Sequence, residues 1–140
     1  MQPDLDYRAL AELRHQIRRF LTFSEREARA AGLEPQHHQV LLAVKGLPAG
    51  LRPTIRVLAE RLELRHHTVV GLVNRLVLAN LVTRRASSVD GREILVRITA
   101  RGERTLRSLS LSHRAELETA GPALVHALEA ILLPSQRRRA

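Results

Sequence analysis

The chain has 140 residues, a length that fits one domain able to bury a core of its own. It has no cysteine, which excludes disulfides, cysteine nucleophiles, thiolate metal sites and thiol-based redox sensing. Its net charge of +9 comes from an excess of arginine, and residues 52–104 hold 11 basic and 5 acidic side chains, so this middle segment is expected to face a polyanion.

The first half of the chain predicts four helices. Apolar residues at three- and four-residue steps indicate a long first helix over residues 4–30, closed by Gly32, and Pro35 starts a second that runs through Val44. The glycines and prolines of KGLPAGLRP predict a loop. Thr54 caps a third helix, and a fourth follows after three or four residues. Two short helices joined by a tight turn are a helix-turn-helix.

After the fourth helix the apolar pattern changes from helical to alternating. The stretch EILVRIT, residues 93–99, predicts a strand, and residues 81–85 predict its partner. Between them, Asp90-Gly91 is a strong hairpin signal. A helix-turn-helix followed by a hairpin is a winged helix.

Two further helices are expected behind the hairpin. Thr99 caps a fifth helix that runs to about Thr119, and Gly121-Pro122 is expected to break it before a sixth. The first helix and the last two each carry an apolar stripe that a lone helix cannot bury. Intertwining with a second copy would bury these stripes and give a two-fold dimer.

The predicted fold class is therefore mainly α with a small β-hairpin wing: a winged helix-turn-helix flanked by N- and C-terminal dimerisation helices. We expect one domain over residues 1–140, with dimerisation helices at 1–33 and 105–140 and a DNA-binding lobe at 34–104.

The start of the fourth helix carries the candidate DNA-reading residues. A helix in the major groove meets base edges with its N-terminal residues, which here are Arg65, His66, His67 and Thr68, with Gly71 one turn on. Arginine grips guanine through two acceptors, and histidine or threonine donates to bases or phosphates. Gly71 removes a side chain from the exposed face and permits close approach. The alternative interpretation is a solvated helix start.

The hairpin carries a second candidate DNA contact. Arg92 follows the Asp90-Gly91 turn, and Arg84 and Arg85 lie on the preceding strand. An arginine at a hairpin tip suits a narrow minor groove, where the negative potential is enhanced. Asp90 is placed to hold the Arg92 guanidinium. The alternative is an ordinary exposed turn with a weak surface ion pair.

Metal and catalytic chemistry find little support in the sequence. The adjacent histidines of His66-His67 and His37-His38 diverge by ~100° on a helix and so do not chelate one ion easily. Convergence of His15, His38 and His113 in space is an open alternative. The chain has no GxSxG, P-loop or GxGxxG motif, so we expect neither an enzyme nor a cofactor.

These residues carry a family resemblance. The runs LAERLELRHHTVVGLVNRLVLANLVTRR and DGREILVRITARG resemble the MarR family of bacterial transcription regulators over about residues 58–102. That family has a T-V-x-x-L-V-x-R-L recognition helix, a D-x-R wing and a V-x-L-T-x-x-G junction. The matching residues are Thr68-Val69, Leu72-Val73, Arg75-Leu76, Asn80-Leu81-Val82, Arg84, Asp90, Arg92, Val96, Ile98-Thr99 and Gly102.

The resemblance implies an obligate homodimer that reads a pseudopalindromic operator in successive major grooves. It implies that Arg92 enters the flanking minor groove with Asp90 as its orienting partner, and that Arg75 is structural or faces a phosphate. The sequence departs from the family pattern at Arg65, His67 and Val70, where small hydroxyl residues are common. Asn74 replaces a frequent aspartate, which removes one negative charge near DNA, and Asn80 replaces a helix-ending glycine. These departures bear on the operator sequence.

The resemblance also implies a small effector. Many relatives are released from DNA by phenolic or carboxylate ligands that bind between the dimer helices and the DNA-reading lobe. Here Arg14 and Arg18 are candidates to pair an anion, His38 stands where the family often places an inward aromatic, and His15 lies nearby in the pattern. Absence of cysteine argues against the peroxide-sensing branch.

The sequence therefore predicts a homodimeric, sequence-specific double-stranded DNA-binding regulator, a repressor released by a small anionic or phenolic effector. The alternatives are a metal-responsive regulator with histidine and carboxylate ligands, and a winged-helix assembly module that binds no DNA. No apolar run approaches the ~20 residues of a membrane span, and the acidic start MQPDLDYRAL is unlike a secretory signal. We expect a bacterial cytoplasmic protein with no membrane partner.

Overall fold

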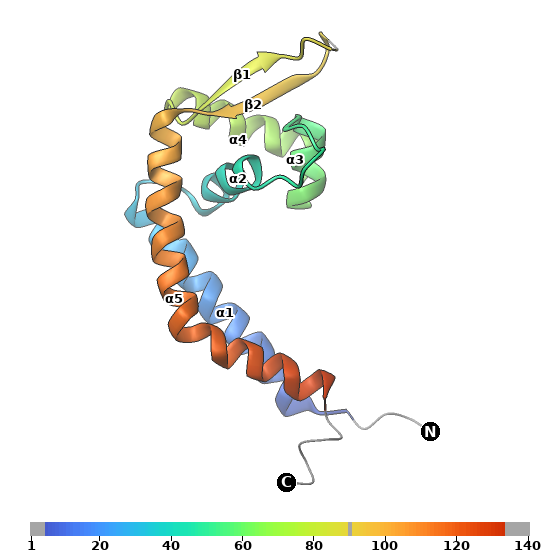
Figure 1. Ribbon diagram of the computed structural model, residues 1–140, viewed down its shortest axis with the longest axis vertical. Helices are drawn as coiled ribbons and strands as arrows, with labels where there is room; N and C mark the ends of the chain where they lie inside the picture. Colours follow the sequence, from blue (N-terminus) through green and yellow to red (C-terminus); the bar gives the residue numbers. More distant parts are fainter. Residues whose placement is uncertain (1–4, 90, 134–140) are drawn as a thin grey trace. The chain divides into compact units, whose positions relative to one another are not determined.

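The computed structural model describes residues 5–89 and 91–133 (Figure 1). The chain divides into two compact units, one formed by residues 28–110 and the other by residues 1–27 with residues 111–140. The long helices α1 (Tyr7–Ala30) and α5 (Ala100–Leu132) each contribute to both units. Each unit is described below by itself.

The unit of residues 28–110 is a winged helix-turn-helix. Its helices are α2 (Pro35–Lys45), α3 (Ile55–Leu62) and α4 (His66–Leu78), and its wing is the antiparallel pair β1 (Val82–Ala86) and β2 (Ile94–Ile98). The register pairs Val82 with Ile98 and Ala86 with Ile94. One apolar core joins these elements, and its largest fully buried members are Val40, Leu41, Leu58, Val69, Val73, Leu76, Val82 and Val96. The predicted fold class, mainly α with a small β-hairpin wing, is confirmed.

Both predicted helix caps of this unit are present. The Thr54 hydroxyl accepts the Val57 N–H at 3.1 Å and begins α3. The Thr99 hydroxyl accepts the Gly102 N–H at 3.0 Å and itself donates to the Asn80 carbonyl at 2.7 Å. Thr99 therefore joins the end of α4 to the start of α5. Asn80 has a φ of 59°, the left-handed conformation that asparagine tolerates.

In the other unit, the N-terminal part of α1 packs against the C-terminal part of α5. His113 hydrogen-bonds the buried Ser24 hydroxyl at 2.8 Å. The rings of Phe20 and Phe23 meet the same imidazole edge-on, with centroids 5.9 Å and 5.3 Å away. His113, one of three histidines that were candidates to converge on a metal, is thus part of a packed aromatic cluster.

The expected break at Gly121-Pro122 is wrong. The helix α5 continues from Ala100 to Leu132 with Pro122 inside it, and residues assigned to a sixth helix belong to α5 (Figure 1). A proline disfavours helical backbone in the preceding residue because its ring clashes with that residue's Cβ. Gly121 has no Cβ, so this clash is relieved, while the lost backbone hydrogen bond and the contact of the ring with the Glu118 carbonyl remain as costs.

The observed boundaries of the first helix and the first strand differ slightly from the predicted ones. The first helix begins at Tyr7 rather than at residue 4, and the Asp6 carboxylate accepts the Ala9 N–H at 3.0 Å. The first strand is one residue later than predicted, at Val82–Ala86. No helix within residues 5–89 and 91–133 is both long enough and apolar enough to span a membrane.

Gly102 is required by the close approach of α5 to the end of α4. A Cβ at this position would lie 2.2 Å from the Leu81 carbonyl oxygen and 2.7 Å from an Ile98 side-chain carbon. The same Leu81 carbonyl accepts the Thr99 N–H at 3.0 Å, so it is fixed in place. The helix therefore packs here only with glycine.

We expect Gly102→Ala to lower the free energy of unfolding by about 1–3 kcal/mol, because overpacking a fixed backbone forces it to shift. Urea denaturation measures the change. The matched control is Gly71→Ala within α4, where a Cβ would meet no described atom within 4 Å, and which should keep or raise stability since alanine favours helix. A Gly102→Ala variant as stable as its parent would contradict this account.

Candidate nucleic-acid interface

The orientation of α4 is set by its buried face. Val69, Leu72, Val73 and Leu76 recur at helical spacing and pack into the core. The turn before the helix bends sharply at Glu63, whose φ is 54°, and the Leu64 N–H bonds the Ala59 carbonyl at 3.0 Å. The two helices are thereby held at a fixed angle.

The first residues of α4 face outward, as the predicted reading role requires. Arg65 is the N-cap, with extended backbone, and its side chain is exposed together with those of His66 and His67. Thr68 is half-buried. One turn on, the space beside Gly71 is open, since a Cβ there would meet no described atom within 4 Å.

Part of the predicted site converges on one hollow, which we name the wing groove. It has a volume of about 240 Å³ and lies between α4, the start of α3 and the wing. The Arg84 guanidinium donates to the Asn74 amide oxygen across it. Its lining residues are Ile55, His66, Val70, Val73, Asn74, Arg84, Arg85, Ala86 and Ile94.

Arg75 lies on a different side of α4. Its charge acts on His37 of α2, whose pKa is lowered first by burial and second by this arginine, while Glu34 opposes the shift. Arg75 thus lies beside α2, while His66, Asn74, Arg84 and Arg85 line the wing groove.

The wing carries the remaining predicted residues. Arg84 pairs with Val96 and Arg85 with Leu95 in the strand register. Gly91 and Arg92 are exposed beyond the strands. Asp90, the proposed partner of Arg92, lies outside the described residues.

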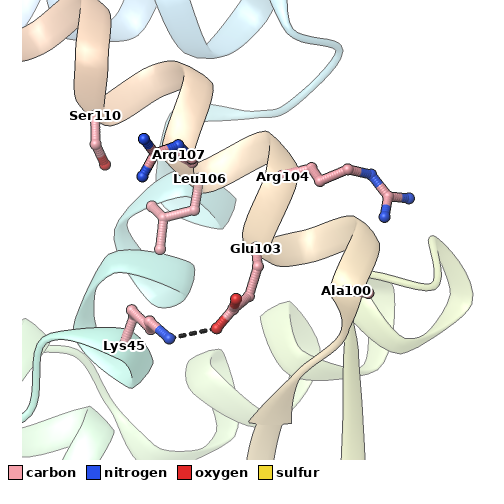
Figure 2. A pocket seen from close by; sticks show the side chains of 7 residues that line it. All are labelled: Lys45, Ala100, Glu103, Arg104, Leu106, Arg107 and Ser110. Atoms are coloured by element: carbon pink, nitrogen blue, oxygen red, sulfur yellow. Dashed lines mark hydrogen bonds and ion pairs between the residues drawn. The ribbon is translucent and has the colours of Figure 1, made fainter.

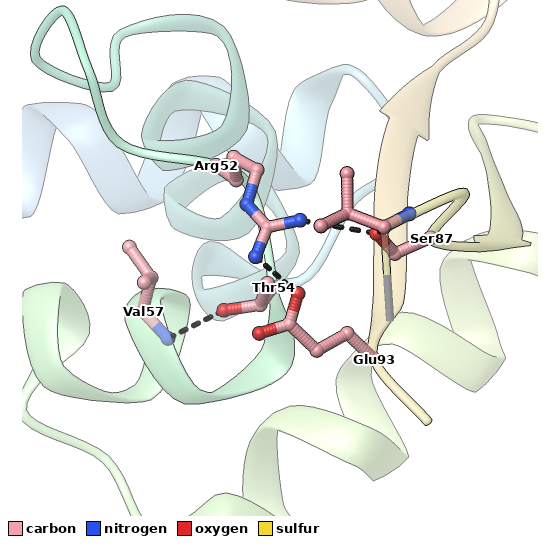
Figure 3. Close-up of polar contacts among 6 residues, drawn as sticks. Arg52, Thr54, Val57, Ser87 and Glu93 are labelled. Carbon is pink, nitrogen blue, oxygen red and sulfur yellow. Dashed lines mark hydrogen bonds and ion pairs between the residues drawn. The ribbon is translucent and has the colours of Figure 1, made fainter. Parts of the chain in front are cut away.

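A residue that sequence analysis missed anchors the wing where its two strands meet the loop. Arg52, in the loop before α3, donates to the Ser87 hydroxyl at 3.0 Å and forms an ion pair with Glu93 (Figure 3). Ser87 and Glu93 also bond through their backbones, from N–H to carbonyl at 2.9 Å. The opposite charges of Arg52 and Glu93 were visible in the sequence, but 41 positions separate them and only the fold brings them together.

The predicted effector residues fall in different places. His15 and Arg18 line a hollow of about 580 Å³ with Arg19, Thr22, Phe23, Arg26, Glu27 and Glu116. Arg14 is exposed on α1. His38 belongs to the other compact unit, where it is 3% exposed in the helix α2.

A second hollow, of about 600 Å³, was not foreseen from the sequence. It lies between the end of α2 and the start of α5, and Figure 2 shows an ion pair across it from Lys45 to Glu103. Its other lining residues are Ala100, Arg104, Leu106, Arg107 and Ser110. We name it the Lys45 hollow.

The described part of the chain contains no cluster of side chains that would support a metal site. Within residues 5–89 and 91–133, histidines, aspartates and glutamates form no group of three or more that is placed to hold an ion.

The fold and this site define a winged helix-turn-helix protein with arginines on α4 and on the wing. Residues 31–93 match the model of the MarR family. Over these 63 of 140 residues, which contain α2, α3, α4 and β1, the chain is similar to that family.

Solved structures share this fold. AbsC, a MarR family transcriptional regulator from Streptomyces coelicolor, is 21% identical, with 96% of this chain and 95% of that one covered and a TM-score of 0.71. CouR from Rhodococcus jostii RHA1, solved with p-coumaroyl-CoA, is 22% identical, with 88% and 90% covered and a TM-score of 0.64. MepR of S. aureus, solved with DNA, is 17% identical, with 88% and 85% covered and a TM-score of 0.64. Comparison with curated proteins gave no match.

The His37 environment predicts a pH-dependent stability. Because the pKa of His37 is lowered in the folded state, the unfolded state binds more protons as pH falls through 6.5. The contribution of His37 to the free energy of unfolding is therefore complete above that pH and is lost below it. We expect the free energy of unfolding to fall less between pH 7.5 and pH 5 in His37→Gln than in the parent, measured by urea denaturation. Equal falls in both proteins would contradict the prediction.

Proposed function

We propose that this chain acts as a homodimer that binds a specific double-stranded DNA sequence, with α4 in the major groove and the wing in the adjacent minor groove, and that it is a repressor released by a small ligand. The observation that carries the proposal is the wing groove. There the exposed start of α4 and two wing arginines converge, so one face presents groups for base edges and for phosphates.

Each predicted residue has a role in this proposal. Arg65, His66 and His67 meet base edges or phosphates, because they are exposed at the N-terminal end of α4. Asn74 is bonded to Arg84, so the helix and the strand present their polar groups together. Half-buried Thr68 takes a supporting position, and Arg75 acts beside α2 or on a phosphate.

The wing supplies the contacts at the flanks. Arg92 and Gly91 are exposed beyond the strands, where a hairpin can follow a minor groove. The orienting role of Asp90 rests on the sequence pattern alone. Arg85 lies on β1, one residue nearer the hairpin tip than Arg84, and adds positive charge.

Gly71→Ala separates DNA contact from folding. Its added methyl projects into open space on α4, so stability should hold or rise by up to about 1 kcal/mol. At a surface closely apposed to DNA the same methyl should weaken binding. We expect a loss of affinity in fluorescence anisotropy with the duplex that flanks the protein's own gene, and a steep fall of parent affinity with salt.

An unrelated duplex of equal length is the control for that measurement. Should Gly71→Ala bind the specific duplex as tightly as the parent at the same salt, the assignment of this face of α4 to the DNA would be wrong.

The dimer proposal rests on the unit of residues 1–27 and 111–140. This unit leaves large apolar side chains exposed on its two helices and directly beside their ends, which are Leu5, Tyr7, Leu10, Ile17, Leu21, Leu111, Leu117, Val125, Leu128, Leu132 and Leu133. A surface of this kind marks a protein interface. A two-fold dimer would present two copies of α4 to half-sites ~34 Å apart.

We expect the protein to sediment as two chains, and Leu128→Glu to dissociate it, because a buried carboxylate would face an apolar interface. Leu51→Glu is the matched control: Leu51 is 45% exposed against 44% for Leu128, but it lies in the loop before α3. Sedimentation of Leu128→Glu as an intact dimer would remove these helices from the interface.

Two hollows support an effector of small anionic or phenolic chemistry. One gathers His15 and Arg18 around the Phe23 ring, which suits a carboxylate with an aromatic body. The other is the Lys45 hollow, with three cationic side chains and one carboxylate. Titration of the protein–DNA complex with small aromatic carboxylates, followed by anisotropy, tests for release.

A further inference from the structure

Arg52 makes two contacts at the loop end of the wing, where β1 ends and β2 begins. Its guanidinium donates to the Ser87 hydroxyl at 3.0 Å, just beyond the end of β1, and pairs with the Glu93 carboxylate just before β2 (Figure 3). The planar guanidinium has a rigid fork of donors, so one side chain holds both strands where they meet the loop. We name Arg52, Ser87 and Glu93 the Arg52 clamp.

The backbone around Arg52 binds the same hairpin. The Val96 N–H donates to the Pro53 carbonyl at 2.9 Å, and Thr54 forms an isolated antiparallel bridge with Leu95. Thr54 is also the N-cap of α3. Residues 52–54 therefore act as a short third strand that ties the wing to the helix-turn-helix.

The Arg52 clamp affects the orientation of the wing more than the free energy of folding. The Arg52 side chain is 46% exposed and that of Glu93 is 28% exposed, so solvent screens their attraction. Pairs of this kind contribute little to the free energy of folding. A fork fixed to both strands nevertheless restricts the tilt of the hairpin, because both strands are held where they meet the loop.

We propose that Arg52 is a positioning residue that holds the wing at the angle at which its arginines reach DNA. The inference rests on the proposed function, since it assumes that the wing contacts DNA. Arg92 is adjacent to Glu93 in the chain, and Arg85 is two residues before Ser87. Movement of the clamp is therefore transmitted to both arginines over one or two residues.

For one substitution, an account based on charge alone and the clamp account predict opposite changes in DNA affinity. If Arg52 and Glu93 acted on DNA only through their charges, Glu93→Gln would remove a negative charge near the phosphates and tighten binding. If they act through the clamp, the same substitution frees the wing and weakens binding. The sign of the change in affinity therefore separates the two accounts.

The experiment measures affinity for the specific duplex by anisotropy with the full-length protein, at one salt concentration and well below the unfolding temperature. We expect Arg52→Gln and Glu93→Gln each to weaken binding about tenfold, as a coupled change of conformation typically does. Arg52→Lys should also weaken it, because the ammonium keeps the charge but lacks the fork. Exposed Arg29, replaced by Gln, is the charge-matched control.

Unchanged or tighter binding by Glu93→Gln overturns the proposal, and so does full affinity of Arg52→Lys. Coupling to Arg92 supplies the second readout. Combined with Arg92→Ala, Arg52→Gln should weaken binding less than it does alone, because the Arg92 contact that depends on wing placement is already lost. Fully additive effects would show that Arg52 acts apart from the wing and would overturn the proposal.

Hydrogen exchange of the free protein distinguishes a failed clamp from a failed DNA assignment. The amides of Ser87 and Val96 should exchange faster in Arg52→Gln, while that of the core residue Leu76 does not change. Full DNA affinity in Arg92→Ala would show that the wing tip is not at the DNA, and would overturn both proposals even with faster exchange. Weakening by Arg92→Ala with no effect of any clamp variant would overturn the clamp alone.

Discussion

Burial of one face of α4 is the constraint on which the interface depends. Val69, Val73 and Leu76 lie fully inside the core, so the helix cannot rotate about its axis without exposing them. That fixed rotation directs His66 and Asn74 toward the wing groove. A recognition helix needs such rigidity, because base contacts fail when side chains are misplaced by a fraction of their length.

The wing depends on two junctions that have different chemistry. At one, Thr99 and Gly102 fix the start of α5 against the carbonyls that end α4, through hydrogen bonds and a close backbone approach. At the other, Arg52 joins both strand ends to the segment that caps α3. The strands are thereby held at both of their ends, while the exposed loop residue Arg92 lies beyond them.

Much of the fold was predictable, because local signals coincide with the tertiary structure. The hydroxyls of Thr54 and Thr99 cap the helices that follow them, and alternating residues form the strands. The break at Gly121-Pro122 was predicted wrongly because both residues were taken as helix-breaking signals. Glycine before proline lacks the Cβ that contributes to the clash with the proline ring, and α5 continues.

The sequence by itself determined the helix-turn-helix and the wing, since periodicity, caps and motif order are local properties of the chain. The tertiary structure alone decided which candidates share a surface. It places His66, Asn74, Arg84 and Arg85 around one groove, Arg75 beside His37, and Arg52 at the wing, where no sequence signal had put it. The physical reason is that side-chain convergence depends on the rotation and packing of whole elements, which contacts distant in the sequence establish.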